Sequence, residues 1–339
     1  MQYRITEKGN LLNEKGRLAT SGYATSLLLH YDRNEIAASP WRIKEWDYYA
    51  VLTAKYGVAF VVSDLGYTAM VSAVFFDFVK KTQKSMTKLF WFTFGKMGLP
   101  SSSEKGNVSC HQQGYDFDFI RNQDERLIKV TIKDFYPGKD LRADLTLKDM
   151  KDETMVIATP WQEKPKAFYY NQKINCIPAY GSVLIGEESY AFKEGEAYGV
   201  LDWGRGVWTY KNTWYWSNLS GIVDGHRVGF NIGYGFGDTS KATENMLFYD
   251  GVSHKLDQVT FEIQEPDFLK PWKFTDNEGR LSLTMEPLVD RQDHTNMIII
   301  KNMGHQVFGK FTGFIVLDDG KRIELKDMIG FAEKITNHY

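Results

Sequence analysis

The segment 229–237, GFNIGYGFG, alternates large apolar side chains with glycine or asparagine. Successive side chains of a β-strand point to opposite faces, so this period of two predicts a strand with one bulky face and one nearly bare face. Glycine inside a strand loses packing and costs backbone entropy, so a row of glycines indicates that something bulky approaches that face. The expected neighbours are the indoles of Trp214 and Trp216, or a ligand, with Asn231 as the polar group on the bare face.

Short alternating segments bounded by turn residues recur along the whole chain. The segment 127–135 alternates apolar and polar residues and ends next to a Pro-Gly pair. Asp250-Gly251 and Asp319-Gly320 each separate two strand-like runs, as the residues of tight hairpins do. Many short strands separated by turns predict an all-β fold of barrel or sandwich type. The best candidate for a helix is a short segment at the C-terminus, within LKDMIGFAEKITNHY.

The length of 339 residues is large for one hydrophobic core, which favours two domains. Residues 160–178 carry three prolines and show little periodicity, as expected for a crossing between two units. We therefore expect two tandem β-barrel or β-sandwich domains, residues 1–170 and 171–339, with an aromatic cavity in the second.

The charge and cysteine content argue against several classes of protein. A net charge of −2 disfavours nucleic acid as the main partner, because phosphate binding needs a basic face. No apolar run reaches the roughly 20 residues that span a bilayer and the start lacks a signal peptide, so we expect a cytoplasmic protein without a transmembrane segment. Cys110 and Cys176 lie far apart and are expected to be free buried thiols. Because no metal or nucleotide motif occurs, we expect neither a metal nor a cofactor.

Tryptophan is concentrated in residues 195–237, which hold four of the nine tryptophans of the chain. Charged and amide side chains lie among them. A buried indole N–H needs a hydrogen-bond partner and a buried charge must be paired, so an ordinary core is built more simply from aliphatic residues. This mixture predicts the wall of a cavity with a few placed polar groups. The residues expected to bind a ligand there are Trp203, Arg205, Trp208, Trp214, Trp216, Asn231, Glu244, Asn245 and His305.

Asp202 is the candidate catalytic residue, because it precedes Trp203 in VLDWGRG. A carboxyl group desolvated beside an indole suits general-acid catalysis. The alternative is a structural role, in a salt bridge to Arg205 or as the cap of a turn. Arg205 itself suits a ligand carboxylate or phosphate through its planar fork, or a cation–π contact with Trp208.

Three further polar residues have two interpretations each. Glu244 and Asn245 lie at the start of a strand-like run, where they would line a barrel mouth or simply be solvated. His305 precedes another run, where it would act as a general acid or base or be held by a hydrogen bond. No second metal ligand stands at a suitable spacing from this histidine.

Six motifs spread over nearly the whole chain are GNLLNEKGRLATSGYA, IKEWDYY, GVLDWGRGVW…WYWSN, TENMLFYDG, PW…GRLSLTMEP and HQVFGKFTG. Together they resemble a bacterial family described only as a domain of unknown function. That family is distantly similar to the lipocalin-like carotenoid hydratases (hydroxyneurosporene synthases) and related two-domain calycin proteins, through a Trp-Gly step followed by a W-x-W strand. The resemblance implies two tandem lipocalin-like domains with an apolar cavity.

The chain departs from the hydratases at a residue that they use as a proton donor. The hydratases carry Asp-His-Asn-Trp-Gly where this chain has residues 200–204, VLDWG. Leu201 replaces the histidine and Asp202 stands where the relatives have asparagine, while Trp203 is retained. The resemblance therefore does not extend to carotenoid hydration itself.

Three functions remain as hypotheses. The first is binding of a small apolar or amphipathic ligand such as a lipid, isoprenoid or polyketide, with cofactor-free acid-promoted hydration, isomerisation or cyclisation as the chemistry it allows. The second is carbohydrate binding or glycoside hydrolysis, with Asp202 and Glu244 as the carboxyl pair. The third is a structural β-protein, which predicts no cavity of roughly 300 Å³ beside Trp214.

Overall fold

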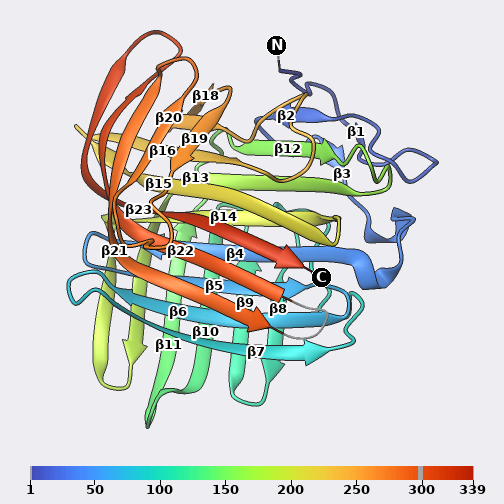
Figure 1. The fold of residues 1–339 in the computed structure, drawn as a ribbon. Helices are drawn as coiled ribbons and strands as arrows, with labels where there is room; N and C mark the ends of the chain where they lie inside the picture. The colour runs from blue at the N-terminus through green and yellow to red at the C-terminus, as the bar shows by residue number, and fades with distance from the viewer. Residues whose placement is uncertain (1, 297–300, 339) are drawn as a thin grey trace.

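Most of the chain forms β-strands (Figure 1), as the alternating sequence patterns predict. The computed structural model describes residues 2–296 and 301–338. Within these residues the helical elements are two 3₁₀ helices, η1 (Arg33–Glu35) and η2 (Pro40–Arg42). None of the described helices is long and apolar enough to span a membrane.

In the described part of the chain, twelve strands form the first sheet. They are β2 (Gly22–Ala24), β4 (Ile43–Leu52), β5 (Tyr56–Asp64), β6 (Thr68–Asp77), β7 (Thr82–Trp91), β8 (Val108–Gln112), β9 (Tyr115–Arg121), β10 (Glu125–Tyr136), β11 (Lys139–Lys148), β12 (Met155–Pro160), β13 (Phe168–Ile185) and β14 (Glu188–Val207). Their order is β7-β6-β5-β4-β14-β13-β11-β10-β9-β8, and β12 pairs with β13 and β2. A separate parallel pair joins β1 (Gly9–Asn10) to β3 (Leu29–His30).

The second sheet has nine strands among the described residues. They are β15 (Lys211–Val223), β16 (His226–Tyr234), β17 (Met246–Tyr249), β18 (Val252–Lys255), β19 (Val259–Glu262), β20 (Trp272–Asp276), β21 (Leu281–Asn296), β22 (Lys301–Val316) and β23 (Arg322–His338). Their order is β18-β17-β16-β15-β23-β22-β21-β20-β19.

The predicted turns are confirmed and the predicted C-terminal helix is wrong. Asp250 and Gly251 both have positive φ, 46° and 85°, and join β17 to β18, as an Asp-Gly hairpin requires. Residues 322–338 form the long strand β23, hydrogen-bonded to β15 on one side and β22 on the other. Pairing along both edges overrides the helical propensity of this segment, since propensity is a weak local preference.

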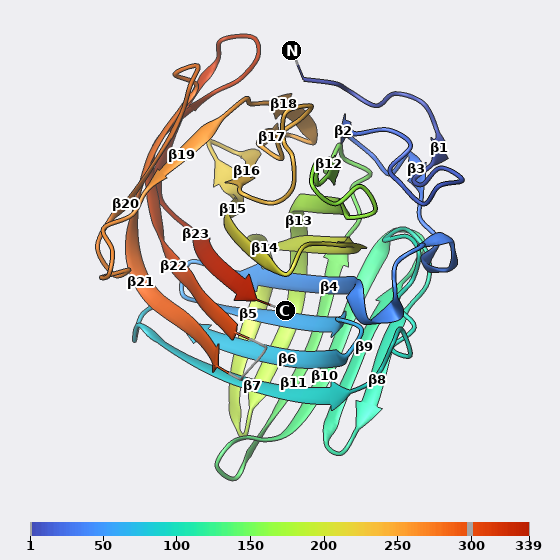
Figure 2. The same ribbon diagram turned by 45° about the vertical axis from the view of Figure 1, so that its right-hand side comes forward.

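Each sheet curls into a half-barrel around its own apolar core (Figures 1 and 2). The predicted all-β fold of two lipocalin-like units is therefore confirmed. The expected division after residue 170 falls inside β13, whereas the chain passes from the first sheet to the second at residues 208–210.

Strands β4, β5 and β6 of the first sheet are buried on both faces, as strands covered on both sides are. In β4, Tyr49 and Val51 face the core of the first half-barrel. Tyr48 and Ala50 face the other way and pack in a cluster with Phe331 of the second sheet. The outer face of one half-barrel thus supports the other, and β21–β23 lie alongside β4–β7 in both views (Figures 1 and 2).

Candidate functional site

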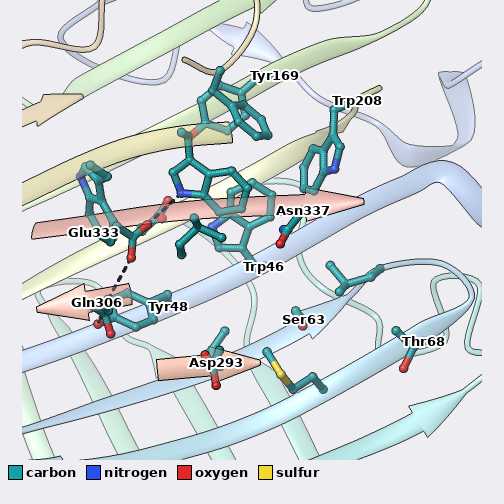
Figure 3. Close-up of a pocket in the computed structure, with 18 of the residues that line it drawn as sticks. Trp46, Tyr48, Ser63, Thr68, Tyr169, Trp208, Asp293, Gln306, Glu333 and Asn337 are labelled. Atoms are coloured by element: carbon teal, nitrogen blue, oxygen red, sulfur yellow. Dashed lines mark hydrogen bonds between the residues drawn. The ribbon is translucent and has the colours of Figure 1, made fainter. Parts of the chain in front are cut away.

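A cavity of about 330 Å³ lies between the two sheets (Figure 3). One side of its wall comes from β4–β7, β13 and β14, and the other from β15 and β21–β23. The cavity therefore belongs to both units rather than to the second unit, where we expected it. Its aromatic lining consists of Trp46, Tyr48, Tyr67, Trp91, Tyr169, Trp208, Trp214, Trp216 and Phe236.

The Phe236 ring packs against two tryptophans of the aromatic wall. Gly235 and Gly237 have positive φ of 95° and 76°, so the chain leaves the β16 direction on both sides of this phenylalanine. Its ring meets those of Trp208 and Trp214 edge to face, with centroids 5.2 and 5.3 Å apart. Edge-to-face aromatic pairs prefer a defined relative orientation, so these contacts fix the positions of the rings in the cavity wall.

Aromatic packing over glycine occurs at a different glycine from those predicted. The indole of Trp46 covers Gly204 of β14, where a side chain would collide with the ring. Other groups lie nearest to the glycines of β16. Gly229 lies against the Cys176 thiol, and Gly233 lies against the Glu244 carboxyl group. The nearest neighbours of these two glycines are thus not indoles, although Trp216 lies opposite Gly233 and its indole reaches Asn231 on the same face.

Lys173 is the cationic centre of the cavity wall. The β13–β14 register places it opposite Asp202, and the lysine Nζ lies 2.7 Å from the Asp202 Oδ2. Asn171 Nδ2 donates to the other oxygen of Asp202 at 2.6 Å. The ammonium also lies 3.8 Å from the ring centroid of Trp216, in cation–π geometry. Asp202 thus pairs with Lys173, and the expected salt bridge to Arg205 does not form.

Glu333 is a buried carboxyl group held by uncharged donors (Figure 3). Trp214 Nε1 donates to its Oε1 at 2.9 Å and Gln306 Nε2 donates to its Oε2 at 3.2 Å. Burial raises the pKa of Glu333 to about 7, against the opposing effects of the Trp214 hydrogen bond and of Lys173. A carboxyl group with a pKa near neutrality can both give and take a proton.

Glu244 is a second carboxyl group in the same wall. It is buried, and burial raises its pKa, while Lys173 opposes the rise and Asp202 adds to it. Glu244, Glu333 and Asp202 therefore interact electrostatically around one lysine. Mutual repulsion of carboxylates favours retention of a proton within this group.

Five of the predicted site residues line the cavity, namely Asp202, Trp208, Trp214, Trp216 and Glu244.

Trp203 and Arg205 lie on the opposite face of β14 from Asp202. Trp203 is fully buried in the core of the first half-barrel. The Arg205 guanidinium stacks over the Trp203 ring at 4.3 Å, not over Trp208 as predicted, and binds Asp47 at 2.9 Å.

Asn231, Asn245 and His305 lie outside the lining of the cavity. Asn231 Oδ1 accepts the indole N–H of Trp216 at 2.6 Å, so it fixes a wall residue from behind. Asn245 accepts the backbone N–H of Gly233 at 2.7 Å. His305 stacks on a phenylalanine ring, with centroids 3.7 Å apart, and its Nδ1 lies 2.8 Å from an aspartate oxygen.

Several cavity residues were missed by the sequence analysis. Lys173 and Tyr169 lie in a Pro-bounded segment that showed little periodicity, although the β13–β14 register places Lys173 opposite Asp202 and Tyr169 opposite Gly206. Gln306 follows His305, and the sequence pattern indicated the histidine rather than the glutamine as a site residue. Glu333 lies in FAEK, which was interpreted as helical; as a strand, that segment places Glu333, Ile335 and Asn337 on the face that lines the cavity.

The stability of the protein is expected to depend on pH through Glu333. Its pKa is about 7 in the folded protein and 4.5 ordinarily, so its contribution to folding is complete below about pH 4.5 and is lost as pH rises through about 7. This difference corresponds to about 3 kcal/mol. The free energy of unfolding, measured by urea titration at pH 4.5 to 8, should fall more steeply with pH in the wild type than in Glu333→Gln. Parallel pH profiles of the two proteins would show that the carboxyl is not perturbed.

No group of three or more His, Cys, Asp or Glu in the described ranges is placed to hold a metal ion.

Two solved structures share this fold over nearly the whole chain. A protein from Nitrosomonas europaea assigned provisionally as AttH has a TM-score of 0.53 and 12% identity, with 90% of this chain and 96% of its own covered. Kievitone hydratase from Nectria haematococca has a TM-score of 0.53 and 10% identity, with 96% and 98% covered. At these identities the likeness shows the fold alone. No curated protein matches the sequence, and the family described as Domain of unknown function (DUF2804) matches residues 2–339.

Proposed function

We propose that this chain, which belongs to the DUF2804 family, binds a small apolar or amphipathic molecule in the cavity between its two sheets. The predicted resemblance to a family of unknown function, distantly related to lipocalin-like hydratases, is confirmed. The observation that carries the proposal is the buried Glu333 carboxyl group in an aromatic wall, held by Trp214 and Gln306.

The composition of the lining supports this class of ligand. Indole, phenol and aliphatic side chains make up most of the wall. The charged groups Lys173, Asp202 and Glu333 interact with one another, while the uncharged polar residues Ser63, Thr68 and Asn337 lie elsewhere in the wall (Figure 3). An apolar pocket with a few converging polar groups is the usual form of a small-molecule site. A lipid, isoprenoid or polyketide with one polar end matches this distribution, and a volume of about 330 Å³ suits a molecule of modest size.

Acid-promoted hydration is the chemistry that we propose for a bound alkene. A proton passes from the Glu333 carboxyl group to one carbon of the double bond, and the second carbon becomes cationic. Water then adds to that carbon and returns a proton to the Glu333 carboxylate, so atoms and charge balance. The faces of the surrounding indoles stabilise the positive charge. The name of one structural neighbour, kievitone hydratase, agrees with this class of reaction.

Asp202 has a supporting role in this proposal. Both of its oxygens accept from donors, one of which is the Lys173 ammonium, whereas the donors to Glu333 are uncharged. We therefore assign proton donation to Glu333 and positioning of Lys173 to Asp202.

Carbohydrate binding is the second candidate, because Asp202 and Glu244 line the same aromatic cavity. Tryptophans beside carboxyl groups suit sugar rings, and a pair of carboxyl groups suits glycoside hydrolysis. The ion pair between Asp202 and Lys173 leaves Glu244 as the acid in that reaction.

Binding of the uncharged apolar dye Nile red tests the proposal. Ser63 is buried and lines the cavity, so Ser63→Phe is expected to fill part of it and to weaken binding about tenfold, which is about 1.4 kcal/mol. Ser189→Phe is the matched control, because Ser189 is exposed near the start of β14. Dye fluorescence gives the dissociation constants, and thermal denaturation shows whether each variant folds.

Competition distinguishes the two candidate functions. Farnesol should displace the dye if the ligand is apolar, and cellobiose or maltose should displace it if the ligand is a sugar. Equal dye binding by the wild type and by a folded Ser63→Phe variant would count against this cavity as the binding site.

A further inference from the structure

A second cavity, of about 690 Å³, lies on the other side of β13 from the first. Gln172 lines the second cavity and its neighbour Lys173 lines the first, because successive residues of a strand point to opposite faces. Other parts of the wall come from the β9–β10 turn, from the end of β11 with the segment that follows it, and from residues 104–106. Most of the residues in this wall are polar or charged, unlike those of the first cavity.

Two buried guanidinium groups share one carboxylate in this wall. Arg121 Nη2 forms an ion pair with Asp149 Oδ2, and Arg126 Nη2 lies 3.8 Å from the same oxygen. The side chains of Arg121 and Arg126 are 8% and 5% exposed. Charges this deeply buried require compensation. One carboxylate between two guanidinium groups leaves an excess of positive charge.

Lys105, Lys148 and Lys151 also line the cavity. Lys148 pairs with Glu194 and Lys151 with Asp124 and Asp149, so these two lysines add little to the excess. Of its three acidic residues, Asp152 is already bound by Arg227, which lies outside the lining. Glu104 remains at the exposed rim.

A buried donor in the wall is unused. Arg121 Nε is inaccessible to solvent and has no hydrogen-bond partner among the residues that the structure describes. The other nitrogens of this guanidinium are occupied by Asp149 and by backbone carbonyls near the β9–β10 turn. Burial and the neighbouring Arg126 lower the pKa of Arg121, as expected when like charges lie close together. A buried polar group without a partner is destabilising, so an acceptor that reached Arg121 Nε would stabilise this corner.

We propose that the second cavity binds a small polar molecule through an oxyanion, either a phosphate or a carboxylate, held by Arg121 and Arg126. The planar guanidinium fork matches the geometry of both groups. Lys105 at the rim attracts the anion and contributes further charge. This ligand differs from that of the first cavity in being anionic, and its site is separated from the first by β13.

Titration calorimetry with inorganic phosphate and with citrate tests the site and distinguishes the two anions. The wild type is expected to bind at least one of them, and Arg121→Gln and Arg126→Gln are each expected to weaken binding about tenfold or more, since each removes a charge-assisted contact. Lys105→Gln should weaken binding about threefold and leave the fold intact, because Lys105 is exposed. Lys129→Gln is the matched control, since that exposed lysine of β10 pairs with Asp144 outside the cavity.

The proposal is overturned if the wild type binds neither anion at concentrations on the order of 10 mM, or if Lys105→Gln and a folded arginine variant bind as the wild type does. If an arginine variant does not fold, the proposal is judged by whether Lys105→Gln binds the anion more weakly than Lys129→Gln does. Nile red binding to the first cavity should be unchanged in all these folded variants, so the two sites are tested independently.

Discussion

Glu333→Gln is expected to slow proton transfer to a bound isoprenoid by about 10²- to 10⁴-fold, the usual contribution of a positioned general acid. The substitution keeps the size of the side chain and its contact with Trp214, and it removes the exchangeable carboxyl proton. Geraniol and farnesol incubated with the protein in D2O should acquire deuterium on carbon when a double bond is protonated. Mass spectrometry of the recovered alcohols measures this exchange directly.

Two further variants show whether a loss of deuterium exchange is specific to Glu333. Glu324→Gln lies on the same strand, at an exposed position beside Arg322, and should exchange at the wild-type rate. Asp202→Asn tests the acid that the sequence first indicated. If this variant loses exchange while Glu333→Gln keeps it, Asp202 is the proton donor. An absence of exchange in the wild type would leave the cavity as a binding site without this chemistry.

The fold was predictable because its signals are local. The Asp250-Gly251 pair specifies its hairpin through backbone conformation, which needs no knowledge of distant residues. Alternation specifies a strand but does not say which sheet it joins. The C-terminal strand illustrates this, since residues 322–338 become a strand by pairing with β15, far back in the chain, as well as with β22. The local sequence propensity of residues 322–338 did not predict this pairing.

The site was predictable only in part because it is assembled across two sheets. Five lining residues were identified from the tryptophan-rich stretch, where the unusual composition is visible in one segment. The partners that determine their chemistry come from elsewhere. Lys173 reaches Asp202 through the β13–β14 register, and Glu333 reaches Trp214 from a strand 119 residues away. Such contacts depend on topology, which no local pattern records.

Strand period also explains which predicted residues lie outside the cavity. Asp202 and Trp203 are adjacent, so when one lines the cavity the other faces the opposite side of β14. The alignment with the hydratases therefore retained a tryptophan that supports the first half-barrel. Arg205 follows two residues later on the same face as Trp203, and it is bound to Asp47 in the interior of the first unit.

Arg205→Met is expected to lower the free energy of unfolding by about 3–5 kcal/mol, because it leaves the buried Asp47 carboxylate without its paired cation. Arg205 is completely buried, and its guanidinium lies 2.9 Å from Asp47 Oδ1 and 3.8 Å from Glu45 Oε1. It also donates to the carbonyls of Trp46 and Pro100 at 2.8 Å, which ties β4 and β14 to the segment before β8. Methionine fills a similar volume and satisfies none of these acceptors.

The pH dependence of the Arg205→Met effect identifies its cause. Burial already raises the pKa of Asp47, and Arg205 opposes that rise, so removal of the arginine raises the pKa further. A raised carboxyl pKa contributes stability that is lost as pH increases, so the variant should be more strongly destabilised at pH 8 than at pH 5. Urea denaturation followed by tryptophan fluorescence measures both. Arg322→Met is the control, because its exposed pair with Glu324 contributes about 0–1 kcal/mol. A loss below about 1 kcal/mol for Arg205→Met, or one independent of pH, would mean that the ion pair does not hold the two strands together.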